Sequence, residues 1–166
     1  DDLDTANSGD LALLDGAGST LQTMLSFASL APLTIVGAGG SLVLDASSTP
    51  DVSQLTFADS GTTTDGVNQV SGLPGEGFET TTFSAFASVT VRGGGAAAEP
   101  LRIASTDGST PSLGAPLVTL VVDADDFANT DASADVLIAE ELSSSITLYL
   151  LGGAGNDSFR LYDDQG

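Results

Sequence analysis

The residues best suited to carry chemistry form a glycine-rich segment near the C-terminal end of the chain. Residues 152–160 read Gly-Gly-Ala-Gly-Asn-Asp-Ser-Phe-Arg and follow the pattern G-G-x-G-x-D-x-U-x, in which U is a large apolar residue. Glycine permits the positive φ angles of a tight turn, and Ca²⁺ prefers carboxylate and carbonyl oxygens. The pattern predicts a calcium-binding turn made of Gly152, Gly153, Gly155, Asn156 and Asp157. The alternative is a plain β turn in which Asp157 caps its own loop.

A second set of carboxylates is divided between the two ends of the chain. Asp2 and Asp4 have the oxygen spacing of a calcium loop, although the segment lacks the glutamate and the flanking helices of an EF-hand. Asp163 and Asp164 lie close to the other end. Carboxylates brought together where one copy follows another would repel unless a cation or solvent lay between them. We expect either a second calcium position at such a junction or a solvated acidic loop.

The overall composition excludes several kinds of active site. The 166 residues include no Cys, no His and no Lys, which excludes thiolate and imidazole metal sites, a Ser-His-Asp triad, a P-loop and a lysine base. The formal net charge of −20 should repel nucleic acid. Paired carboxylates suffice for glycoside hydrolysis, but the acids here lie in predicted turns without an aromatic platform. We therefore expect no catalytic residue and no enzymatic activity.

No segment approaches the roughly 18 consecutive apolar residues that a membrane-spanning helix needs. The chain also starts without Met or a basic leader segment, which is typical of a mature or excised piece. The absence of Lys together with the excess of Asp suits a saline or calcium-rich exterior, so we expect an extracellular or cell-surface protein. The acidic surface of a halophilic protein is the other interpretation of the same composition.

The elements that must position these residues are predicted to be β-strands almost throughout. Short runs rich in Val, Ile, Leu, Thr and Phe alternate apolar and polar residues and end at Gly, Ser, Asp or Pro. The clearest strands are expected at residues 33–36, 41–44, 54–57, 88–92, 101–103, 118–122, 146–151 and 159–162. Residues 133–142 are predicted to form either a single helical turn or a strand at 136–138. Arg92, Arg102 and Arg160 occupy comparable strand positions and are expected to form ladders with Asp on a solvent-facing surface.

Three glycine turns indicate an internal repeat. They begin at Gly37, Gly93 and Gly152, each after one strand and before another, which gives a unit of about 55 residues. The third copy is divided between residues 142–166 and 1–24, so the end of one chain reads into the start of another. The ends then meet either within one closed threefold domain or between successive copies in an array.

Two of these patterns resemble known families. Residues 152–160 resemble the haemolysin-type (RTX) calcium-binding nonapeptide. That resemblance implies that Asp157 and main-chain carbonyls bind Ca²⁺, and that Phe159 points into the core of a parallel β-roll. The other two glycine turns have no Asp in the liganding position, so the resemblance implies no calcium there. The longer repeat, with residues 80–91 as its best example, resembles the β-helical repeats of very large bacterial surface proteins such as those of planctomycetes.

Together these observations predict an all-β fold, namely a parallel β-helix or β-solenoid. Residues 1–166 would form a single module built from about three degenerate repeats. Because a solenoid has open edges at both ends that must be capped or paired, we expect an extracellular structural module. It would form homo-oligomers or filaments by stacking head to tail, stabilised by calcium, with no nucleic-acid partner and no membrane span. The alternative is a closed threefold β domain, of the β-trefoil or β-prism kind, that binds carbohydrate.

Overall fold

The computed structural model describes residues 8–14, 21–28, 33–46, 54–73, 78, 80–93, 100–124 and 132–162, with side chains from residue 33 onward. These residues form β-strands and no helix, so the prediction of an all-β fold is confirmed. The strands are β1 (Ser8–Leu14), β2 (Leu21–Ala28), β3 (Leu33–Val36), β4 (Ser41–Asp45), β5 (Leu55–Asp59), β6 (Val67–Ser71), β7 (Thr81–Ser84), β8 (Ser88–Arg92), β9 (Pro100–Ser105), β10 (Thr119–Asp123), β11 (Val136–Glu141), β12 (Thr147–Leu151) and β13 (Ser158–Leu161).

The strand β11 decides between the two predictions made for residues 133–142. Its residues alternate between half-buried and buried side chains over most of its length. That period of two is the pattern of a strand with one face in the core, so the predicted helical turn is wrong and the predicted strand is confirmed.

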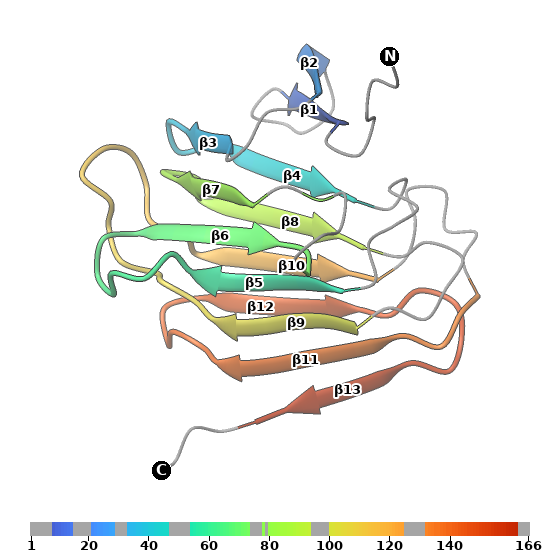
Figure 1. Ribbon diagram of the computed structural model, residues 1–166. Coiled ribbons are helices and arrows are strands. Elements are labelled where there is room, and N and C mark those ends of the chain that lie inside the picture. Colours follow the sequence, from blue (N-terminus) through green and yellow to red (C-terminus); the bar gives the residue numbers. More distant parts are fainter. Residues whose placement is uncertain are drawn as a thin grey trace.

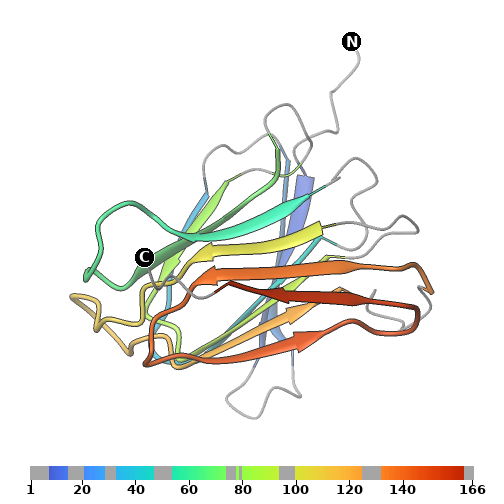
Figure 2. The ribbon, with the colours of Figure 1, turned by 90° about the horizontal axis from the view of Figure 1, so that it is seen from below.

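The strands lie in two large sheets and one small one (Figure 1). The four-stranded sheet has the order β12-β10-β8-β4 and is parallel throughout. The seven-stranded sheet has the order β13-β11-β9-β5-β6-β7-β3. From β8 to β13 the chain alternates between these two sheets, and each strand from β10 onward pairs in parallel with the strand two elements before it. Figure 2 looks along this stack from the β13 end.

The seven-stranded sheet departs from the uniform parallel solenoid that the sequence predicts. β5 and β6 pair antiparallel, as do β6 and β7, and β3 pairs with β7 in parallel. The chain reverses after β5 in a tight loop at residues 60–66, where Gly61, Thr64 and Gly66 have positive φ angles. Glycine adopts such angles without a steric penalty. The local sequence therefore makes an antiparallel hairpin in a sheet that was expected to be parallel.

Side chains between the two large sheets form rows, because the parallel strands keep their register. One row in the four-stranded sheet is Leu42, Val89, Leu120 and Leu148. A row in the seven-stranded sheet is Leu55, Leu101, Leu137 and Phe159. The first three residues of each row are buried in one apolar core. Both rows continue into the last strand of their sheet, where Leu148 is only partly buried and Phe159 is 50% exposed.

Ion pairs also cross the strands. Arg92 on β8 lies between Asp45 on β4 and Asp123 on β10, with nitrogen–oxygen distances of 4.0 and 3.5 Å. Arg102 on β9 makes a two-point contact with Glu140 on β11, with distances of 3.1 and 2.6 Å. The structure thus contains the expected arginine–aspartate ladder at Arg92, whereas the partner of Arg102 is a glutamate.

The three glycine turns do not occupy equivalent places in the sheets. The strands before the second and third turns are β8 and β12, both in the four-stranded sheet, but the strand before the first turn is β3 in the seven-stranded sheet. Glycine suits a tight connection between any two strands, so turns that look alike in sequence need not share a place in the fold. The residues predicted to complete the split third copy include β1, which pairs with β2 in a separate small sheet.

Leu137 and Leu161 allow the core to be tested with one kind of substitution. Leu137 is fully buried, whereas Leu161 is 69% exposed. Leu137→Ala should lower the free energy of unfolding by about 2–5 kcal/mol because it leaves a cavity. Leu161→Ala should lower it by about 0.5 kcal/mol or less. Urea unfolding at low protein concentration measures both values, and equal losses would contradict the described core.

Candidate functional site

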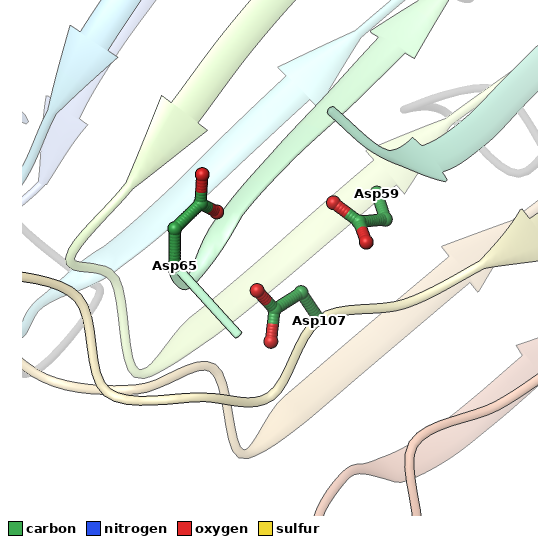
Figure 3. Close-up of side chains that lie close together, drawn as sticks. All are labelled: Asp59, Asp65 and Asp107. Atoms are coloured by element: carbon green, nitrogen blue, oxygen red, sulfur yellow. The ribbon is translucent and has the colours of Figure 1, made fainter. Parts of the chain in front are cut away.

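Three carboxylates from different parts of the chain meet at one end of the seven-stranded sheet. Asp59 ends β5, Asp65 lies just before β6, and Asp107 follows β9. Oxygen atoms from the three side chains lie within 4.8 Å of one another. Figure 3 shows the three side chains gathered around a common space. Within the described ranges, this is the group of acidic side chains that comes close enough to share a metal ion.

Asp107 is the most buried of the three, and backbone donors surround its carboxylate. Its Oδ2 accepts hydrogen bonds from the backbone N–H groups of Thr64 (3.0 Å) and Gly66 (2.7 Å). Its Oδ1 accepts one from the backbone N–H of Ser109 (2.8 Å). The buried Asn68 side chain also exchanges two hydrogen bonds with the backbone of Asp107, at 2.9 and 2.8 Å. The hydrogen bonds of Asp107 therefore hold the hairpin loop at residues 60–66 against the end of β9.

The pKa of the Asp107 carboxyl group lies below its ordinary value. Burial by itself acts to raise this pKa, but the hydrogen bonds from Ser109, Gly66 and Thr64 favour the charged form and together outweigh burial. The carboxylate is therefore ionised at neutral pH, and its contribution to stability depends on that charge.

Asp59 and Asp65 complete turns in the same loop. Asp59 Oδ1 accepts a hydrogen bond from the backbone N–H of Gly61 (3.2 Å), and Asp65 Oδ1 accepts one from that of Val67 (2.9 Å). Three neighbouring carboxylates could hold a hard cation such as Ca²⁺ or Mg²⁺, whose preferred ligands are oxygens. Each carboxylate nevertheless already accepts a backbone hydrogen bond. Stabilising the loop at residues 60–66 is therefore a sufficient reason for all three acidic side chains to lie here.

The sequence interpretation did not include this cluster. Its members meet only because β5 and β9 are neighbours in the sheet and because the chain reverses between β5 and β6. Strand patterns do not specify which strands pair. The available signal was the placement of Asp59 and Asp65 at the two ends of a loop rich in glycine and threonine.

The glycine turn that was predicted to bind calcium lies between β12 and β13. Gly153 and Gly155 have positive φ angles, as the prediction of a tight turn requires. A Cβ atom on Gly155 would also collide with the backbone carbonyl oxygen of Ser133. Glycine at residue 155 is thus required both by the backbone conformation and by the close approach of the segment before β11.

Asp157 turns back over its own loop. A Cβ atom on Gly152 would lie 2.5 Å from Asp157 Oδ2, and Asp157 Oδ1 accepts a hydrogen bond from the backbone N–H of Asp135 (3.2 Å). The other predicted side-chain ligand, Asn156, is exposed. The calcium site at Gly152, Gly153, Gly155, Asn156 and Asp157 therefore stays a prediction.

The other predicted calcium ligands cannot be placed beside this turn. Asp2, Asp4, Asp163 and Asp164 all lie outside the described residues. The predicted junction between the two ends of the chain therefore stays a prediction.

β12 and β13 are edge strands of the two large sheets, and no described strand covers their outer side, which we call the uncovered end (Figure 2). Thr147 N–H donates to the carbonyl of Val118, and Tyr162 N–H donates to that of Ala139, so these groups face the preceding strand. In a parallel ladder the backbone groups of alternate residues point the other way, where no described strand pairs with β12 or β13. Large apolar side chains are exposed along this end, at Tyr149, Leu151, Phe159, Leu161 and Tyr162.

At the uncovered end, Phe159 occupies a core position in the strand register but remains half exposed. The family resemblance implies that Phe159 points inward, and its place in the row after Leu137 agrees with an inward position. Half of its surface is nevertheless exposed, because no described strand follows β13 to cover it. Edge strands with this character readily pair with a further strand.

No protein-family model, curated protein or solved structure matches this chain. The two family resemblances seen in the sequence therefore stay predictions. Among the residues that the structure describes, there is no helix that could cross a membrane.

Asp107→Asn tests whether the charge of this carboxylate holds the loop. The substitution should lower the free energy of unfolding at pH 7 by about 1–3 kcal/mol, because an amide cannot accept all three backbone hydrogen bonds. A carboxyl group with a lowered pKa stabilises the fold above its unfolded pKa of about 3.9, and this contribution disappears as the pH falls through the folded pKa. The difference between wild type and Asp107→Asn should therefore shrink at pH 3. Urea unfolding at both pH values measures it, and a difference unchanged by pH would contradict this role.

Proposed function

We propose that this chain is a structural module that assembles end to end, with a second copy adding its strands to β12 and β13. The observation that carries the proposal is the uncovered end of the core. The rows of apolar side chains run through the buried strands and stop at Phe159 and Leu161, which are 50% and 69% exposed. Covering such surface contributes about 25 cal/mol for each Å² removed from water.

The direction of the strands supports head-to-tail stacking. All strands of the four-stranded sheet point the same way, from β12 at one edge to β4 at the other. In the seven-stranded sheet, the two reversals at β6 and β7 restore the original direction, so β3 runs parallel to β13. Because the two sheets have four and seven strands, a second copy would have to be tilted as well as displaced along the stack to bring β4 beside β12 and β3 beside β13, each in parallel.

The side chains at the two ends are also compatible. β4 contributes the apolar Leu42 and Leu44 to the core, and β3 contributes Ile35. These residues would continue the rows that end at Leu148, Leu150 and Phe159. The small sheet of β1 and β2 lies beside β4 (Figure 1), so it would have to move aside for β12 of a second copy to pair with β4. The interface between copies, here called the joint, would therefore include residues of the N-terminal segment that the sequence assigns to the split repeat.

Two finer features belong to this proposal. On this proposal, β8 to β13, which alternate between two sheets, would form a short β-solenoid, with β6 and β7 as an insertion. Calcium would stabilise the joint, where Asp163 and Asp164 of one copy would approach Asp2 and Asp4 of the next. A cation that binds only the joined state favours that state. The setting would be extracellular, and no catalytic role is proposed.

Leu161→Lys tests the proposed joint, with Leu113→Lys as its matched control. Leu161 lies in the edge strand β13, whereas Leu113 is 75% exposed in the loop between β9 and β10. A lysine at residue 161 is solvated in a single copy but would be buried by stacking, which is costly for a charge. Light scattering across a range of concentrations should show wild type and Leu113→Lys growing in mass, and Leu161→Lys remaining monomeric with an unchanged unfolding midpoint.

Negative-stain imaging with calcium and with excess chelator separates the two parts of the proposal. Filaments that dissociate on chelation support calcium at the joint, and filaments that persist support stacking while removing calcium from it. Compact single particles under both conditions would contradict stacking and would favour a closed, ligand-binding β domain.

A further inference from the structure

We infer that a groove at one end of the seven-stranded sheet binds a segment of another protein that carries lysine or arginine. The groove has a volume of about 850 Å³ and lies across the ends of β5, β9, β11 and β13. Its lining combines acidic and apolar side chains, namely Asp59, Glu140, Glu141, Leu142, Leu161 and Tyr162. Because stacking would cover Leu161, a second copy and this segment would compete for the groove, and binding of the segment needs only a single copy.

The charge of the groove is negative after internal ion pairing. Arg102 balances Glu140 through their two-point contact. Asp59 and the exposed Glu141 add two further carboxylates to the lining. Asp65 and Asp107 lie next to Asp59. A concave surface lined by one sign of charge concentrates ligands of the opposite sign, so the groove attracts cationic groups.

The apolar part of the lining favours a long cationic side chain over a bare metal ion. Leu142, Leu161 and Tyr162 all expose a large part of their surface. Lysine and arginine have an apolar stem and a charged head, so their stems would cover these residues while their heads meet the carboxylates. The face of the Tyr162 ring also attracts a cation.

A second copy of this chain offers little positive charge for such a segment. The chain has three basic residues in all. Two of them, Arg92 and Arg102, already form ion pairs with acids of their own copy. Only the exposed Arg160 remains. The occupant that matches the groove in charge is therefore a basic segment of a different protein.

A labelled hexalysine peptide tests this site by fluorescence anisotropy at a protein concentration where the chain is monomeric. The double variant Glu141→Gln/Tyr162→Ala should weaken binding by about tenfold, since it removes one charge and one aromatic contact. The matched control is Asp45→Asn/Tyr149→Ala, which removes the same kinds of group from the four-stranded sheet. Tyr149 and Tyr162 are similarly exposed, at 52% and 56%. The control should change the affinity by less than about twofold.

Three results would overturn the inference. Equal weakening by the two double variants would show that the peptide responds only to the overall negative charge. Unchanged binding by Glu141→Gln/Tyr162→Ala would place the peptide elsewhere. Spermine that displaces the peptide at equal or lower concentration would identify a free polyamine, and not a polypeptide, as the ligand. None of these results depends on whether the chain stacks end to end, because the measurement is made on single copies.

Discussion

The register of the parallel strands is the constraint on which the rest of the structure depends. Side chains alternate between the two faces of a strand, so a shift of one residue would exchange the inner and outer faces. In register, Leu101 lies beside Leu137 and Val89 lies beside Leu120, and the core between the sheets consists of such rows. The same register places Arg92 between Asp45 and Asp123. Packing in the core and ion pairing thus depend on one geometric condition.

That condition also explains why the molecule has an uncovered end. A row of stacked side chains can be extended by any further strand in register, and β10 and β11 are covered on this side by β12 and β13, the strands two elements later in the chain. Phe159 is chemically suited to the core and keeps its place in the row, yet half of its surface is exposed. By contrast, the turn between β5 and β6 interrupts the parallel order, and its loop is held by a hydrogen-bonded side chain. That side chain is Asp107, which accepts the backbone hydrogen bonds of Thr64 and Gly66.

The positions of strands and turns could be predicted from the sequence, but which strands pair with one another, and in which direction, could not. The period-two alternation at residues 88–92 and 118–122 predicts strands correctly, because burial of one face needs only local sequence. The glycines at residues 153 and 155 predict a turn because the positive φ angles that a tight turn needs are also a local property. The antiparallel pairing of β5 with β6 depends on which neighbour a strand finds, and alternation is identical for either direction. The acidic cluster at Asp59, Asp65 and Asp107 was missed because it exists only after that pairing is known.

Amide hydrogen exchange, compared between low and high protein concentration, tests the central claim most directly. If a second copy adds its strands to the uncovered end, the outward amides of Leu148, Leu150, Phe159 and Leu161 should exchange more slowly as concentration rises. Amides in β8 and β10 already lie between two strands, so their exchange should not change. Exchange from β12 and β13 that is fast at every concentration, in samples whose core amides are protected, would contradict the account.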